Sequence, residues 1–300
     1  MLVVDQLREQ TNLKYQIIPL TTTGDAQVNR SLTAIGGDGV FVKELFAALQ
    51  DGRADVAVHS LKDLPTSLPP ELCAGSVPER EDARDVLISR ENEYTSIDAL
   101  PREALVGTSS LRRAAQLRLR RPDLHIVPLR GNVDTRLSKV LKGECTAAVL
   151  ALAGLRRVDL LQNVGGGSPL SHDVMVPAVG QGALFVQCRS GDEVVRRLVA
   201  TIDHAPSALA TRMERAFLAV LGGGCVAPVG AHVEMSGDTW NLVAIVAATD
   251  GTKALRRSGS GSTKDAAEAV RTVEAIASEM LGAGAAELIA QARQRDNVNT

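Results

Sequence analysis

The stretch LVGTSSLRRAAQL, residues 105–117, shows the pattern that decides the fold. A short apolar run ends in small polar residues, and helical periodicity begins directly after Ser110. Two other stretches have the same design, ADVAVHSLKDLPT at residues 54–66 and HIVPLRGNVDTRLSKVL at residues 125–141. Short apolar strands that alternate with amphipathic helices in this way indicate α/β domains.

The remaining sequence predicts how these units are divided into domains. The charged segment PEREDARD, residues 78–85, predicts a hinge between a first and a second domain. The glycine-rich stretch 163–171 is consistent with a crossing of the chain back to the first domain. From about Pro206 the pattern changes to a helix, a GGGC loop, two strands and a terminal helical region. We therefore expect a first α/β domain (1–78 with 177–203), a second (84–174) and a C-terminal α+β domain (205–300).

Composition excludes several classes of protein. The formal net charge of −2 provides no global field that would attract nucleic acid or an anionic membrane. No window approaches the roughly 18 consecutive apolar residues of a membrane span. The four cysteines are distant in sequence and include no CxxC pair, which predicts neither a zinc site nor a disulfide framework. We expect a cytoplasmic protein with free thiols that binds neither nucleic acid nor membranes.

Ligands of open α/β sheets bind where the strands end, so polar residues at these positions are the first candidates for a site. In residues 54–66 a strand leads directly into His59, Ser60, Lys62 and Asp63. An acid beside a base at such a position suits proton transfer. The alternative is a surface turn in which Lys62 and Asp63 are solvated.

Residues 105–117 predict an anion site. Free N–H groups at a helix start attract anions, and the hydroxyl groups of Thr108 and Ser110 add donors. Arg112 and Arg113 stand in the first helical turn, where the macrodipole disfavours cations, so a bound carboxylate would explain them. The alternatives are a solvated arginine face or, less well supported with 2% aromatic residues, a nucleic-acid site.

The third stretch adds further arginines after a strand. Arg130 follows the strand and Arg136 opens the next helix, and guanidinium groups bind carboxylates bidentately without losing their charge. Arg156 and Arg157 could extend this cationic cleft, although paired arginines after a turn can equally face solvent.

Cys225 lies in LGGGCVAPVG, residues 221–230, where three glycines leave its thiol uncrowded. This setting leaves two interpretations open: an exposed, covalently useful sulfur, or the inert small apolar side chain that a lone cysteine usually is. Cys73, Cys145 and Cys188 have no such setting, and we interpret them as structural. His125 and His204 have no partner at metal-ligand spacing, so no metal site is expected.

Seven strings occur in one order along nearly the whole chain: VHSLKDLPT, EREDARDVLIS, GTSSLRRAAQL, LRGNVDTRLSK, AGLRR, VPAVGQGAL and GGGCVAPVGAH. Together they resemble the porphobilinogen deaminase (hydroxymethylbilane synthase) family. The resemblance implies two periplasmic-binding-protein-like (type II) α/β domains around a cleft, plus an α+β domain that carries the cysteine. It also implies a monomeric, cytoplasmic transferase of tetrapyrrole and haem biosynthesis.

The implied reaction deaminates porphobilinogen and joins four units head to tail into hydroxymethylbilane, with release of ammonia at each addition. Each unit carries an acetate and a propionate group. Because carboxylates accumulate in one cleft as the product grows, clustered arginines are physically reasonable.

The resemblance also assigns roles to residues at matching positions. The catalytic aspartate corresponds to Asp63, and a dipyrromethane cofactor is attached through a thioether to Cys225. The residues that bind the cofactor correspond to Ser60, Lys62, Thr108, Ser110, Arg112 and Arg113. Those that bind the substrate or growing chain correspond to Arg130, Arg136 and Arg157.

Two departures from the family pattern keep a second interpretation open. The usual N-terminal strand and R-x-S-x-L-A loop do not precede the helix with which this sequence starts, and Asp38 stands where a lysine is usual. A negative charge there would repel a polyanionic substrate. The alternative is therefore a non-catalytic or weakened anion-binding relative with the same fold.

Overall fold

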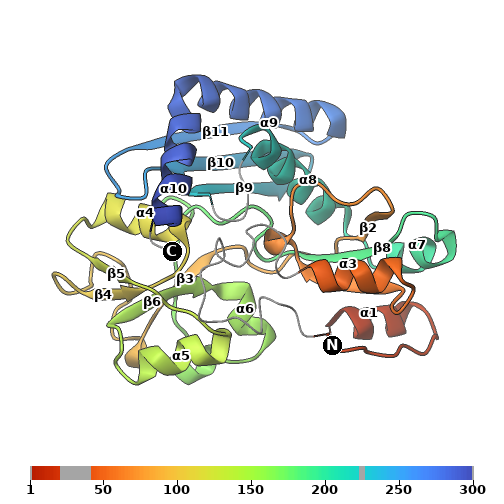
Figure 1. The fold of residues 1–300 in the computed structure, drawn as a ribbon, viewed down its shortest axis with the longest axis horizontal. Coiled ribbons are helices and arrows are strands. Elements are labelled where there is room, and N and C mark those ends of the chain that lie inside the picture. The colour runs from red at the N-terminus through yellow and green to blue at the C-terminus, as the bar shows by residue number, and fades with distance from the viewer. Residues whose placement is uncertain (1, 21–41, 223–226, 299–300) are drawn as a thin grey trace.

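The computed structural model describes residues 2–20, 42–222 and 227–298. Their strands form three separate sheets. Figure 1 shows the C-terminal sheet lying across two smaller units, which we call the first and second lobes. Asp38 and Cys225 lie outside the described residues. Among the described residues, no helix is both long and apolar enough to cross a membrane.

The first lobe is built on an antiparallel sheet of order β1-β8-β2. The strands are β1 (Val56–Ser60), β2 (Leu72–Ser76) and β8 (Leu184–Arg189), and the adjacent helices are α1 (Leu2–Gln10), α3 (Lys43–Gln50) and α7 (Glu193–Ala200). The central strand β8 is almost continuously buried. Since β8 returns to pair with β1 and β2 after the whole second lobe, the chain crosses between the lobes twice.

The second lobe contains a mixed sheet of order β5-β4-β6-β3-β7. Its strands are β3 (Asp85–Ser89), β4 (Leu105–Gly107), β5 (His125–Val127), β6 (Ala147–Ala151) and β7 (Ser168–Pro169), and its helices are α4 (Leu111–Arg120), α5 (Val133–Leu141) and α6 (Leu152–Arg157). Strands β5, β4 and β6 run parallel. Their carboxyl ends therefore share one edge of the sheet, from which α4, α5 and α6 begin.

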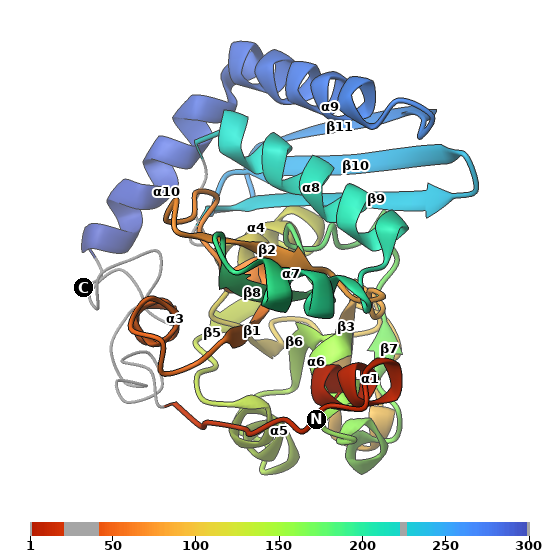
Figure 2. The same cartoon turned by 90° about the vertical axis from the view of Figure 1, so that its right-hand side faces the viewer.

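The C-terminal domain is an antiparallel sheet of order β11-β10-β9 covered by helices, as Figure 2 shows from the side. Its elements are α8 (Ala205–Val220), β9 (Val229–Ser236), β10 (Thr239–Ala247), β11 (Ala254–Ser262), α9 (Ala266–Met280) and α10 (Ala286–Val298). Trp240, Phe217 and Val273 are fully buried in its apolar core. The predicted fold class, α/β with an α+β C-terminal part, is confirmed, while the predicted domain bounds stay a prediction.

The four remaining short helical segments are η1 (Leu61–Asp63), η2 (Arg90–Asn92), η3 (Leu161–Val164) and η4 (Leu281–Ala285). At helix starts the sequence was informative to within a few residues. Asn132 caps α5, so this helix begins at Val133, three residues before Arg136, with which the sequence predicted it to open. Asp265 is the N-cap of α9 and accepts hydrogen bonds from two backbone N–H groups, and Ser262 ends β11.

The two crossings between the lobes lie against each other. The Glu81 N–H donates to the Gly182 carbonyl at 3.2 Å, and the Gln181 side chain donates to the Ala83 carbonyl at 2.8 Å. Gly182 adopts a φ of +85°, and a Cβ atom there would stand 2.3 Å from the Glu81 carbonyl oxygen. Only glycine fits without moving the backbone.

Candidate active site

A cavity of about 220 Å³ lies where the two lobes and the C-terminal domain meet. Lys62 and Asp63 reach it from the end of β1, and residues 108–113 reach it from the start of α4. Arg136 from α5 and Gln181 from the second crossing complete its polar lining. The C-terminal domain contributes apolar side chains, including Ala227 and Val229. All three parts of the fold are thus needed to build this site.

Asp63 is held at the end of the short helix η1, between the buried anchors Leu61 and Leu64. Its carboxylate accepts no hydrogen bond from any residue that the structure describes. Burial raises the pKa of Asp63, opposed by the positive charges of Lys62, Arg136 and Arg113. Burial likewise lowers the pKa of Lys62, opposed mainly by Asp63. This carboxylate is surrounded by positive charge but has no fixed hydrogen-bond partner.

Arg112 and Arg113 share one internal carboxylate, that of Asp85 at the start of β3. Arg112 binds both oxygens of Asp85, at 2.6 and 3.3 Å, and Arg113 Nε donates to Asp85 at 2.9 Å. All three side chains are almost fully buried. Although burial favours the neutral acid, Arg112 and Arg113 hold the pKa of Asp85 well below its ordinary value. These arginines therefore do not form the solvated face that was the sequence-based alternative.

Gln181 completes this network from the second crossing. Its amide nitrogen donates to Asp85 at 2.9 Å, and Arg112 also donates to the carbonyl of Val176 at 2.6 Å. Four cations, Lys62, Arg112, Arg113 and Arg136, thus face two carboxylates, Asp63 and Asp85, an excess of two positive charges. A small polyanion would compensate this excess.

The hydroxyl groups before α4 shape the loop. Thr108 Oγ1 accepts a hydrogen bond from the Ser110 N–H at 3.2 Å, and Ser110 is the N-cap of α4 and accepts from the Arg113 N–H. Ser109 Oγ accepts from the Leu129 N–H at 3.0 Å, which ties this loop to the end of β5. The loop is held in place before any ligand is bound, and its hydroxyl hydrogens remain available as donors.

The other expected site residues lie at or beyond the cavity rim. Arg136 Nε donates to the Gly131 carbonyl at 2.7 Å, and burial lowers the pKa of Arg136 against the opposing effect of Asp63. Arg157 is exposed and donates to the carbonyl of Gly182 at 2.6 Å. Ser60 and Arg130 do not line the cavity. Ala227 and Val229 do line it, whereas Cys225 lies outside the described residues.

Sequence reasoning missed Asp85 and Gln181 as site residues. Asp85 was considered only as the end of a charged hinge, although a charge that opens the apolar strand DVLIS was a usable signal. Gln181 stands between two glycines in VPAVGQGAL, a backbone that approaches its neighbours closely. Among the described residues, no cluster of three potential metal ligands is present.

The fold and the cavity together define a class: a two-lobed α/β protein with a cationic cavity that contains a carboxylate to which no described residue donates a hydrogen bond. Family models give the particular family. Residues 1–197 match the porphobilinogen deaminase dipyrromethane cofactor binding domain, and residues 208–282 match the porphobilinogen deaminase C-terminal domain. The porphobilinogen deaminase of Moorella thermoacetica is 46% identical over 281 residues, which cover 94% of this chain and 88% of that protein. The chain belongs to the porphobilinogen deaminase family of transferases, which function in tetrapyrrole biosynthesis with a dipyrromethane cofactor.

Solved structures of substrate-binding proteins also resemble part of the chain. One is the periplasmic VFT2 domain of Bordetella pertussis BvgS, with a TM-score of 0.40 and 20% identity over 67% of this chain and 74% of that chain. Another is the substrate-binding protein of an amino acid ABC transporter, with a TM-score of 0.36 and 14% identity over 67% of this chain and 77% of that chain.

Proposed function

We propose that the cavity at Asp63 is where this chain joins four porphobilinogen units head to tail into hydroxymethylbilane and releases ammonia at each addition. The observation that carries this proposal is the carboxylate of Asp63, which accepts no hydrogen bond from the described residues and lies in a cavity with an excess of positive charge. Family membership supports this activity, and no finding favours the non-catalytic alternative.

Asp63 would act on the substrate in two ways. When ammonia leaves porphobilinogen, the remaining azafulvene is electron-poor, and its positive pyrrole nitrogen is stabilised by a fixed carboxylate. The same carboxylate can hold and pass a proton, because its raised pKa brings it closer to the working pH. Neither role requires Asp63 to break an existing hydrogen bond.

The cavity fits the carboxylates of a dipyrromethane cofactor. Lys62 lines the cavity and donates no hydrogen bond to a described residue. Arg113 uses Nε and Nη2 for Asp85 and Gln181, which leaves Nη1 available. When bound, the cofactor supplies the anchored primer on which the product grows. We assign its attachment to Cys225 and its carboxylate contacts to Ser60, Lys62, Thr108, Ser110, Arg112 and Arg113.

The remaining arginines suit the incoming substrate and the growing chain. Arg136 lines the cavity beside Asp63 and is placed to bind the carboxylates of the reacting unit. Arg130 and Arg157 lie outside the cavity lining and would bind units added later. We further propose that the enzyme acts as a monomer in the cytoplasm and binds no nucleic acid.

The mass of the intact purified protein tests this proposal. We expect two pyrrole units on the wild-type chain and none on Cys225→Ala, because only a thioether at Cys225 would keep them through denaturation. Cys145→Ala is the matched control and should retain the adduct, since Cys145 is buried in the second lobe. A wild-type mass without any addition, in protein that also lacks activity, would contradict the proposal.

A further inference from the structure

Two cysteines that are 115 residues apart in sequence face each other in the first lobe. Cys73 in β2 and Cys188 in β8 are directly opposite partners in the antiparallel register, and their Sγ atoms are 3.9 Å apart. Opposite residues of antiparallel strands have Cα atoms about 4.5 or 5.5 Å apart, and both distances fall within the range that a disulfide spans. Small side-chain rotations would bring the two sulfurs to bonding distance.

The two thiols differ in their access to solvent. Cys188 is fully buried with Val186, Val199 and Ile202, whereas Cys73 packs at the edge of this cluster and is partly exposed. Burial and the neighbouring Cys73 raise the pKa of Cys188 to about 12. Cys73 is therefore the thiol that an external reagent meets first, and Cys188 is held as its internal partner.

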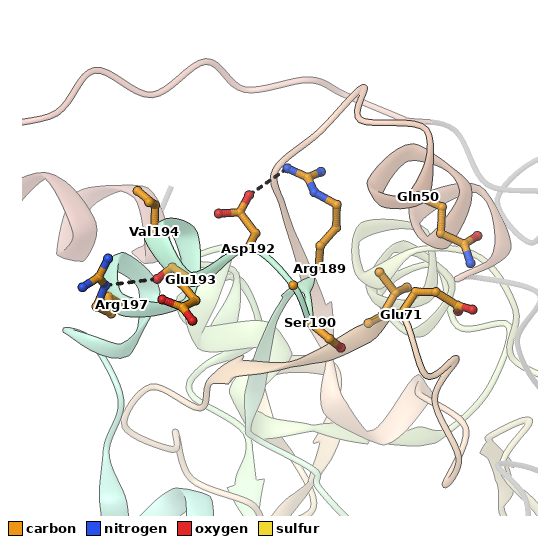
Figure 3. A pocket seen from close by; sticks show the side chains of 10 residues that line it. Gln50, Glu71, Arg189, Ser190, Asp192, Glu193, Val194 and Arg197 are labelled. Carbon is orange, nitrogen blue, oxygen red and sulfur yellow. Dashed lines mark hydrogen bonds and ion pairs between the residues drawn. The ribbon is translucent and has the colours of Figure 1, made fainter.

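A wide depression of about 1060 Å³ opens at the same end of this sheet. It is lined by Leu72 and Arg189, which are the chain neighbours of the two cysteines. Figure 3 shows the Arg189 side chain paired with the Asp192 carboxylate, while Arg197 Nε donates to the backbone carbonyl of Glu193. The two cysteines do not line this depression, so the partial exposure of Cys73 itself is what gives a reagent access to the pair.

We propose that Cys73 and Cys188 are a redox-sensitive pair that closes to a cross-strand disulfide when the protein meets a low-molecular-weight disulfide such as oxidised glutathione. The thiolate of Cys73 attacks one sulfur of the reagent, whose S–S bond breaks and releases one thiol. Cys188 then loses its proton and attacks Cys73 Sγ, which releases the second thiol. The protein loses two electrons, the reagent gains them, and the two protein protons leave on the released thiols.

The new disulfide would stabilise the first lobe against unfolding. It would close a loop that contains the whole second lobe, and a closed loop of this size restricts the unfolded chain strongly. In the register of the sheet, Cys188 is paired with Val56 at one end of β1, while Ser60 and the following Asp63 are at the other. The bond would therefore stabilise the lobe without blocking the cavity.

The experiment treats the native holoenzyme with oxidised glutathione and then alkylates and digests it without reduction. We expect a peptide that links Cys73 to Cys188, a rise in Tm on the order of 5 °C, unchanged kcat, and full reversal by dithiothreitol. Cys73→Ser should lose both the link and the Tm rise. Cys145→Ser, which removes a buried thiol of the other lobe, should keep both.

Three outcomes would overturn the proposal. A stable glutathione adduct on Cys73 alone would show that Cys188 does not reach it. Full alkylation of both cysteines after treatment would show that the pair does not react. A linked peptide with an unchanged Tm, or the same Tm rise in Cys73→Ser, would show that the disulfide does not stabilise the first lobe.

Discussion

Asp63 and Glu214 are both carboxylates at the junction of the two lobes and the C-terminal domain, yet their surroundings differ. Glu214 on α8 is fully buried and binds Arg80 through both oxygens, at 2.6 and 3.1 Å. It also accepts the N–H groups of Gly180 and Val233, and His232 Nδ1 lies 3.3 Å away. Asp63, in contrast, accepts no hydrogen bond from the part of the chain that the structure describes.

This difference appears in the two pKa values. Burial alone would raise the pKa of Glu214, but Arg80 and His232 lower it to about 2. For Asp63 burial prevails over Lys62, Arg136 and Arg113, and the pKa rises. A carboxylate with all its acceptor positions filled stabilises the fold, whereas one that accepts no hydrogen bond from the described residues suits the substrate role that we propose for Asp63.

Removing the charge of Glu214 should have the largest effect. Glu214→Gln leaves Arg80 buried without a counter-charge, and we expect the free energy of unfolding to fall by about 3 to 5 kcal/mol. Urea titration measures this loss, and activity per folded molecule should change little. An unchanged urea midpoint of unfolding would contradict the comparison, because Glu214 would then not stabilise the fold.

Asp63→Asn should affect catalysis rather than stability. The amide keeps the shape but cannot offset positive charge, so kcat should fall on the order of 10²- to 10³-fold. Single-turnover kinetics with porphobilinogen would measure it, with Tm as the control for folding. Near-normal turnover would remove Asp63 from the catalytic role.

Acid should act on the two carboxylates with opposite signs. The folded pKa of Glu214, about 2, lies below its ordinary value of 4.5, so its stabilisation is complete above pH 4.5 and is lost as the pH falls towards 2. The expected loss is about 3 kcal/mol, and it should be absent from Glu214→Gln. The raised pKa of Asp63 means that its burial opposes folding at neutral pH, and this cost disappears on acidification. Unfolding titrations at several pH values in wild type and both variants would separate the two effects.

The smallest effect on the free energy of unfolding is expected for an ion pair that remains in contact with water. Arg156 contacts Glu81 at 2.7 Å, but their side chains are 42% and 34% exposed. Arg156→Ala should therefore cost only about 0.2 to 1 kcal/mol in urea titration. A loss as large as that of Glu214→Gln would mean that burial does not distinguish these ion pairs.

Much of the arrangement could be predicted from local pattern. The strand-to-helix stretches correctly located α4 and placed Lys62, Asp63, Thr108, Ser110, Arg112, Arg113 and Arg136, all of which line one cavity. For the residues of the second lobe this works because parallel strands expose their carboxyl ends at the same edge. Lys62 and Asp63 follow β1 of the antiparallel first sheet and reach the cavity from the other lobe. The roles of these residues stay a prediction.

Partnerships between distant residues could not be predicted in this way. Asp85 neutralises Arg112 from a strand 27 residues earlier, and Cys73 meets Cys188 only because β8 returns to the first sheet after a whole lobe. Such contacts depend on strand register and side-chain packing, which have no local periodicity. The sequence likewise could not predict that three of the candidate residues lie outside the cavity lining, namely Ser60, Arg130 and Arg157.

Gly182 sets the spacing between the two crossings, since a Cβ atom there would overlap the carbonyl oxygen of Glu81. The first crossing carries the chain from the lobe that bears Asp63 to the lobe that bears Arg112, and the second crossing returns it. A single methyl group at residue 182 would therefore wedge the lobes apart and change the width of the cleft, although it would touch neither residue. In this architecture a position without a side chain, next to Gln181 in the cavity wall, would set how closely the two lobes approach each other.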